Sequence, residues 1–287
     1  MNRTPILILL TVLLAAACGP ATPEGPIVIS GPDPPTVAET PAWIPPDQLD
    51  LPEPVRGLDP QPGEHVLQSL TVTDPYTGDP LAMDYWVWLP PDYTSAQQWP
   101  AILYLHGSGQ EGGNPHRAIV YGLPPIIDEQ ARPFVLITPH FPANTLWEDH
   151  AANVDAILQT ALDTLSIDPD RVYLTGVSAG GYATWAQALA TPERFAAVVS
   201  VSGSVLRESI PSRDALCPLA DVPLWGVHGA QDTISDPQVS AAYVDYVAGC
   251  DGADVRWTLW ADTDHFTTVA RLYGSDDFYA WLLERSR

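Results

Sequence analysis

The sequence predicts one α/β domain with a mostly parallel β-sheet, placed behind an export signal and a linker. Short apolar runs of strand length alternate with helical segments along most of the chain. The helical segment 151–165 has apolar residues at i, i+3, i+4 and i+7, which marks one buried face. With 287 residues, 46% of them hydrophobic, the chain is long enough to bury a large core.

The charge composition excludes several classes of protein. The chain has 35 acidic residues against 12 basic ones, a formal net charge of −23, and every basic residue is an arginine. Without lysine there is no Schiff-base chemistry, no Ser–Lys hydrolase and no lysine-dependent nucleotide site. So acidic a chain repels phosphate backbones, and we expect no nucleic-acid partner. An acidic enzyme or binding domain remains.

Residues 1–18 have the layout of a signal peptide. Arg3 precedes an apolar run over 6–14 that is too short to span a membrane, and three alanines then lead to Cys18. A cysteine after small residues resembles the lipobox of bacterial lipoproteins, although Ala15 stands where leucine is usual. We therefore expect a secreted or cell-surface protein that meets the membrane only through a lipid on Cys18. Simple secretion after cleavage near Ala17 is the alternative.

Residues 19–60 form an acidic, proline-rich segment that we expect to lie outside the fold. The segment holds 12 of the 31 prolines and shows no period of 2 or 3.6. This composition favours an extended, polyproline-like tether. The folded domain is accordingly predicted over residues 61–287.

The folded part begins with two strands and continues with strand–helix units. The segments 66–73 and 81–89 are expected to pair as antiparallel strands around a turn at Gly78-Asp79-Pro80. Further apolar runs suit strands of a parallel sheet that helices cover on both faces. The predicted strands are 101–105, 134–138, 172–175, 196–201, 224–228 and 255–260, and the predicted helices are 151–165, 179–190, 237–248 and 275–285.

The segment Gly176-Val177-Ser178-Ala179-Gly180 is a G-x-S-x-G motif in the context that its chemistry requires. An apolar strand precedes it and an alanine-rich helix follows, so the serine stands on a sharp turn at the edge of the sheet. Small residues at Gly176 and Gly180 let the backbone pack closely there. The helix N-terminus supplies a positive dipole and the free N–H of Ala179 for a developing oxyanion. Ser178 is the predicted nucleophile.

A serine nucleophile needs an imidazole base, and two of the seven histidines follow Ser178 in the chain. In sites of this type the chain order is serine, acid, histidine. His265 follows the last predicted strand and is placed on a loop at the carboxyl edge of the sheet, which favours it as the base. His228 ends a strand ahead of Gly229, where a packing role is expected, and it is the second candidate.

Asp232 is the predicted acid of the triad. It follows the strand that ends at residue 228 and so lies at the same edge of the sheet as His265. Asp236 is the alternative, but a proline follows it and marks it as a helix cap. Asp262 and Asp264 adjoin the histidine and are expected to shape its loop.

The second oxyanion donor is expected from the loop after the third strand, Leu105-His106-Gly107-Ser108-Gly109. The glycines let the backbone approach a substrate, and we assign the donor to the N–H of Ser108, with Gly109 as the alternative. A tight corner with no role in binding is the other interpretation of this segment.

These motifs together resemble the α/β-hydrolase superfamily. The segments that carry the resemblance are LHGSG, DPDRVYLTGVSAGGYATW, PERFAAVVSVSG, HGAQD and DTDH, within residues 65–287. More narrowly they are similar to bacterial secreted or periplasmic esterases, depolymerases and predicted peptidases related to the prolyl-oligopeptidase catalytic domain. The resemblance implies an α/β-hydrolase fold, the triad Ser178, Asp232 and His265, and an oxyanion hole at Ala179 and Ser108.

The sequence therefore predicts an extracytoplasmic serine hydrolase that cleaves a small or oligomeric carboxylic ester through an acyl-enzyme on Ser178. A tether, in place of an upstream propeller domain, favours an esterase over a dedicated peptidase. A serine peptidase acting on short peptides is the second hypothesis, and a non-catalytic binding protein of this fold is the third.

No cofactor and no metal are expected. His116, His140 and His150 lack the spacing of zinc ligands and are placed on the surface or in loops. Aromatic residues near the nucleophile could line a pocket or pack in the core. These aromatic residues are Trp147, Tyr182 and Trp185.

Cys217 and Cys250 are predicted to form a disulfide, since an exported domain meets an oxidising compartment. Cys217 lies ahead of the strand 224–228. Cys250 follows the helix 237–248, which returns to the amino edge of the sheet. Both cysteines thus fall on the side opposite the triad.

Overall fold

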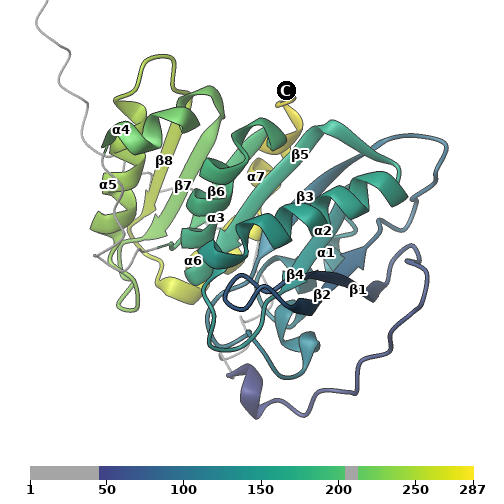
Figure 1. Cartoon of the computed structure of the whole chain (residues 1–287). Coiled ribbons are helices and arrows are strands. Elements are labelled where there is room, and N and C mark those ends of the chain that lie inside the picture. The colour runs from purple at the N-terminus through teal and green to yellow at the C-terminus, as the bar shows by residue number, and fades with distance from the viewer. Residues whose placement is uncertain (1–44, 204–212) are drawn as a thin grey trace, which may run out of the picture.

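The computed structural model describes residues 45–203 and 213–287, and its centre is an eight-stranded β-sheet with helices on both faces (Figure 1). Cys18, the predicted signal peptide and most of the predicted tether lie outside the described residues. The strands are β1 (His65–Thr73), β2 (Pro80–Trp88), β3 (Trp99–Leu105), β4 (Val135–His140), β5 (Ile167–Val177), β6 (Ala197–Val201), β7 (Leu224–Gly229) and β8 (Val255–Trp260).

Helices connect most of the later strands. The α-helices are α1 (Leu123–Gln130), α2 (Ala151–Thr164), α3 (Ala179–Ala190), α4 (Arg213–Leu216), α5 (Pro237–Ala248), α6 (His265–Tyr273) and α7 (Asp276–Leu283). Short 3-10 turns are η1 (Pro46–Gln48), η2 (Pro115–Ile119), η3 (Trp147–His150), η4 (Pro192–Arg194) and η6 (Cys217–Asp221). Within the described ranges, no helix combines the length and apolar character that crossing a bilayer requires.

The strand order is β1-β2-β4-β3-β5-β6-β7-β8. β1 pairs with β2 and β2 with β4 in antiparallel fashion, and every later pairing is parallel. The predicted fold class is therefore confirmed: two leading antiparallel strands precede a parallel α/β sheet. The parallel strands all point their carboxyl ends toward one edge, where ligands bind in sheets of this type.

Successive residues of β3 enter two different cores, because side chains alternate across a strand. Leu103 packs into a cluster with the apolar faces of α2, α3 and α5. Ile102 and Tyr104 pack into a second cluster with α1, α6 and α7. Since every residue of β3 is buried, the strand reads as a continuous apolar run without polar alternation.

Three α-helices, α1, α4 and α6, lie where the sequence pattern predicts none. α1 begins Leu123-Pro124-Pro125, and prolines are tolerated there because the first turn has no backbone N–H to donate within the helix. α6 begins at His265, so this histidine opens a helix and the expected loop placement is wrong. Asp264 caps that helix by accepting hydrogen bonds from the backbone N–H groups of Phe266 and Thr267.

The end of the proline-rich segment contacts the domain. Arg56 forms an ion pair with Asp84 on β2, with 2.5 Å between Nη2 and Oδ2. The Asn114 side chain donates to the carbonyl of Pro52 at 2.8 Å. These contacts hold residues 52–56 against the folded domain. Composition alone assigns these residues to the tether, which is predicted to end at Pro60.

His140 and His150 are buried, which corrects their expected placement on the surface or in loops. His106, at the end of β3, is also buried; its ring stacks on Phe141 and meets Trp147 edge-on, each at a centroid distance of 5.0 Å. Burial lowers the pKa of His106 to about 3, and the neighbouring His140 adds to the effect. The folded protein therefore keeps this imidazole neutral well below its ordinary range.

We expect this buried imidazole to make folding acid-sensitive. Below pH 6.5 the unfolded chain protonates residue 106, whereas the folded chain does so only near pH 3, so stability is full above pH 6.5 and falls as pH drops. In His106→Asn, the amide still donates toward the Gly107 carbonyl but does not titrate. Between pH 6 and pH 5 the free energy of unfolding should fall by about 1 kcal/mol more in the wild type than in the variant. Urea titrations at both pH values measure this, and equal losses would contradict it.

The predicted disulfide is present. Cys217 opens η6 ahead of β7, and Cys250 follows α5 ahead of β8. Their sulfur atoms are bonded at 2.05 Å, with 5.5 Å between the Cα atoms. Both cysteines precede the amino ends of neighbouring strands, so the bridge lies away from the carboxyl edge.

Replacing both cysteines by serine should lower stability and leave catalysis intact. The bridge joins residues 33 apart in sequence, and the loop-closure model gives a stabilisation of about 3–4 kcal/mol for a loop of that length. The melting temperature of the Cys217→Ser/Cys250→Ser variant should therefore fall by about 10 °C. Thermal melts and turnover at 25 °C, compared with a reduced wild type, test this. An unchanged melting temperature or a large loss of turnover would contradict it.

Candidate active site

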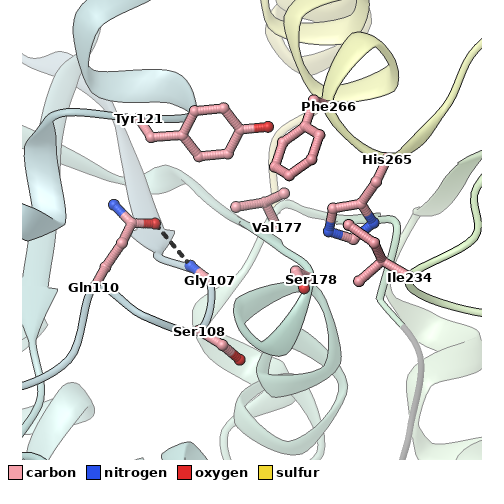
Figure 2. A pocket seen from close by; sticks show the side chains of 9 residues that line it. All are labelled: Gly107, Ser108, Gln110, Tyr121, Val177, Ser178, Ile234, His265 and Phe266. Atoms are coloured by element: carbon pink, nitrogen blue, oxygen red, sulfur yellow. Dashed lines mark hydrogen bonds between the residues drawn. The ribbon is translucent and has the colours of Figure 1, made fainter. Parts of the chain in front are cut away.

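The candidate active site is a pocket of about 170 Å³ at the carboxyl edge of the sheet. Loops that follow β3 and β7, the turn after β5 and the first residues of α6 supply most of its lining. Figure 2 shows the residues that line the pocket, which come from separate elements around Ser178. The lining residues are Gly107, Ser108, Gln110, Tyr121, Val177, Ser178, Ile234, His265 and Phe266.

Ser178 stands on a strained turn between β5 and α3. Its backbone has φ +57° and ψ −118°, a conformation that residues other than glycine rarely adopt. The Ser178 N–H donates to the Val201 carbonyl at 2.9 Å, and the Ser178 carbonyl accepts from the Tyr182 N–H at 2.9 Å. These bonds fasten the turn to β6 and α3 and hold the hydroxyl in the pocket, where the sequence predicts a nucleophile.

Glycines on both sides of Ser178 permit this turn. A Cβ atom on Gly180 would lie 2.0 Å from the carbonyl oxygen of Leu105 at the end of β3. A Cβ atom on Gly176 would lie 2.4 Å from the Gly180 carbonyl oxygen. The expectation that these positions need small residues for close backbone packing is confirmed.

His265 and Asp232 meet across the same edge of the sheet. His265 Nδ1 lies 2.7 Å from Asp232 Oδ2. The other carboxylate oxygen, Oδ1, accepts from the N–H groups of Ile234 and Ser235, each at 2.9 Å. Asp232 is thus fixed by its own loop, and it orients the ring of a histidine that faces the pocket together with Ser178.

The environment of Asp232 keeps its carboxylate ionised. Burial alone would raise its pKa, but hydrogen bonds from two imidazoles and a backbone N–H outweigh burial and hold the pKa well below its ordinary value. A negative charge that is stable at neutral pH can stabilise a positive charge on the adjacent ring of His265.

The remaining aspartates near the site have structural roles. Asp236 caps α5 by accepting from the Gln238 N–H, as expected from the proline that follows it. Asp262 forms an ion pair with Arg271 at 2.8 Å. Neither therefore competes with Asp232 as the partner of His265.

The loop after β3 places Ser108 and Gly107 in the pocket beside Ser178. The Gly107 N–H donates to Gln110 Oε1 at 3.2 Å, so this N–H is already engaged. Gln110 Nε2 in turn donates to the Arg117 carbonyl at 2.6 Å, which anchors the loop. Ala179, the other expected donor, is the first residue of α3.

The aromatic lining of the pocket differs from the residues expected from sequence. Trp147 and Trp185 are buried in the core, so core packing accounts for them. Tyr121 and Phe266 line the pocket instead, with their rings edge-on at a centroid distance of 5.9 Å. Phe266 could have been suggested by its place beside His265, whereas nothing local to Tyr121 points to the site.

A second histidine, His228, also contacts Asp232. The sequence predicts a packing role for this residue and keeps it as the second candidate for the base. Its Nε2 atom lies 3.0 Å from Asp232 Oδ2. The spacing of four residues in His228-Gly229-Ala230-Gln231-Asp232 is the one sequence signal of this contact.

Among residues 45–203 and 213–287, no group of three or more histidine, cysteine, aspartate or glutamate side chains is arranged to hold a metal ion. The chemistry that the described pocket offers is that of a serine hydroxyl, an imidazole, a carboxylate and backbone N–H groups.

Comparison with known proteins agrees with this arrangement. Residues 146–212 match the prolyl oligopeptidase family. Feruloyl esterase D of Neurospora crassa is 28% identical over 163 residues, which cover 52% of this chain and 53% of that protein. A probable feruloyl esterase C of Aspergillus flavus is 36% identical over 92 residues, or 32% of each chain. The matched part of the chain thus covers about half the length of the first relative and about a third of the second.

A solved structure shares the fold over most of the chain. The crystal structure of a thermostable esterase superposes with a TM-score of 0.64 at 25% sequence identity, covering 77% of this chain and 63% of that one. The strand order, the strained turn at Ser178 and the superposition on this esterase together show that the chain has the α/β-hydrolase fold.

Proposed function

We propose that the protein is a serine hydrolase that cleaves carboxylic esters. One observation carries the proposal: Ser178 on its strained turn shares a pocket with His265, whose Nδ1 lies 2.7 Å from Asp232. This is the arrangement of nucleophile, base and orienting acid that acyl transfer to a serine requires.

In the proposed reaction, Ser178 Oγ attacks the ester carbonyl while His265 accepts its proton. Asp232 holds Nδ1 of His265, which leaves Nε2 for this transfer. The tetrahedral oxyanion is stabilised by the backbone N–H groups of Ala179 and Ser108. Collapse expels the alcohol, which takes the proton from His265, and leaves an acyl group on Ser178. Water, deprotonated by His265, then releases the carboxylic acid and restores the serine.

The pocket favours an ester with an apolar or aromatic acyl group. Tyr121, Phe266 and Ile234, which is 61% exposed, supply apolar walls, and no arginine lines this pocket. The similarity to proteins named feruloyl esterases supports an aromatic acyl group. A serine peptidase acting on short peptides is the second candidate, because residues 146–212 match the prolyl oligopeptidase family.

An extracytoplasmic location is part of the proposal. The disulfide between Cys217 and Cys250 is the kind of bond that persists in oxidising compartments. The signal-like sequence that ends in Cys18 supports export, with a lipid on Cys18 as the anchor.

A substrate panel tests the proposed reaction. The wild type should hydrolyse p-nitrophenyl esters, with aromatic acyl groups preferred, and leave aminoacyl-anilides nearly untouched. It should also react with a fluorophosphonate probe. Ser178→Ala should lose labelling and at least about a thousandfold in kcat, because the covalent step has no other nucleophile. Ser166→Ala, at the amino end of β5, is the matched control and should keep both. Faster cleavage of anilides than of esters would favour the peptidase, and labelling that persists without Ser178 would reject the assignment.

The anchor is tested by fractionation. If Cys18 carries a lipid, the full-length protein should partition into membranes, and Cys18→Ser should move it to the soluble fraction because the acyl chains are lost. Mass spectrometry of the N-terminal peptide provides the chemical control. Identical partitioning of the two proteins would reject the lipid anchor and leave simple secretion.

A further inference from the structure

His228 ends β7 inside the protein, with 0% of its surface exposed. Its Nε2 atom lies 3.0 Å from Asp232 Oδ2, the same oxygen that His265 Nδ1 contacts at 2.7 Å. Two imidazoles from different elements therefore share one carboxylate oxygen. One of them faces the pocket, and the other does not line it.

The direction of the bond between His228 and Asp232 follows from the partners of Nε2. The Asp232 carboxylate oxygen at 3.0 Å and the Ser235 carbonyl oxygen at 3.3 Å can only accept. The Ser235 hydroxyl lies farther away, at 3.4 Å, and has closer acceptors in the Ser202 carbonyl and Asp232 Oδ2. Nε2 must therefore carry a proton and donate it. Asp232 Oδ2 then receives a hydrogen bond from His228 in addition to its contact with His265.

The other side of the His228 ring is fixed by α5. Nδ1 lies 2.9 Å from Ser240 Oγ, and this hydroxyl lies 2.5 Å from the carbonyl oxygen of Gly203. Gly203 packs directly against Gly181 in the first turn of α3, where a Cβ atom would clash at 2.5 Å. A chain of hydrogen bonds thus connects the acid to the backbone beside the nucleophile helix.

We propose that His228 is a positioning residue of the triad, which holds the carboxylate of Asp232 in place by donating from Nε2 while Ser240 fixes its ring. The inference rests on the proposed function, because it assigns His228 a role through Asp232 and His265. Without the hydrogen bond from His228, Oδ2 keeps the hydroxyl of Ser235 at 3.0 Å as its remaining partner besides His265. The N–H groups of Ile234 and Ser235 still hold Oδ1, but Oδ2 can shift about that oxygen. A base displaced by a fraction of an ångström transfers protons less efficiently.

Two substitutions separate positioning from packing. In His228→Gln the amide nitrogen reaches the place of Nε2 and can still donate to Asp232. In His228→Asn the amide nitrogen corresponds to Nδ1, so the contact with Ser240 can form and the contact with Asp232 is lost. Both variants are uncharged, but asparagine leaves more empty volume than glutamine. A role in packing alone therefore predicts losses that follow the melting temperature, whereas positioning predicts a loss of kcat in His228→Asn beyond its loss of stability.

The experiment measures kcat, KM, the rate of fluorophosphonate labelling at Ser178 and the melting temperature. We expect His228→Asn to lose about 10–100-fold in kcat and to be labelled correspondingly more slowly, with KM within about twofold of the wild type. His228→Gln should recover most of that loss. His116→Asn, outside the pocket, is the control for a histidine substitution and should behave like the wild type.

Equal losses in the glutamine and asparagine variants, or an unchanged kcat in His228→Asn, would overturn the proposal. If neither variant folds, Ser240→Ala decides: it should lower kcat by about 3–10-fold by releasing the ring, and an unchanged kcat would overturn the proposal. A wild type that neither reacts with the probe nor cleaves esters would instead refute the proposed function, so the two failures are distinguishable.

Discussion

The close approach of α3 to the end of β3 is the contact on which the site depends. Gly180 lies so near the Leu105 carbonyl that no side chain fits between them. Because of this contact, the turn at Ser178 and the loop after β3 lie side by side and line the same pocket. A hydroxyl on one element and backbone N–H groups on two others are thereby held at fixed positions by van der Waals exclusion, before any hydrogen bond is counted. The positive φ at Ser178 is the local cost of that placement.

The second requirement is a buried negative charge in a chain that is already strongly acidic. Asp232 has no arginine partner in the described structure; its five hydrogen-bond contacts come from imidazoles, a hydroxyl and backbone N–H groups. Most of the described arginines form ion pairs elsewhere, largely at the surface, where such pairs contribute little. Neutral donors and histidines therefore hold the acid, and a guanidinium that would oppose a positive charge on His265 stays out of the site.

Much of this could be predicted from sequence because it is local. The apolar runs predict all eight strands. The G-x-S-x-G motif selects Ser178, and position in the chain selects Asp232 and His265, which the structure brings to the same edge. α6 was missed since its β-branched residues and aromatics resemble a strand end, and its start is set by the cap at Asp264. The place of Tyr121 in the pocket and the contact of His228 with Asp232 depend on tertiary packing. A single aromatic residue or histidine leaves no periodic pattern in the sequence from which such a contact could be predicted.

The position of the disulfide in the chain affects what happens when a protease cuts near the site. The covalent loop between Cys217 and Cys250 encloses β7, Asp232 and α5, whereas Ser178 and His265 lie outside it. The segment after Asp232 includes the exposed side chain of Ile234, the kind of surface position that proteases attack first. A single cut there leaves two polypeptides still joined through sulfur, and the sheet pairings of β7 with β6 and β8 remain to hold the nicked acid loop beside its histidine.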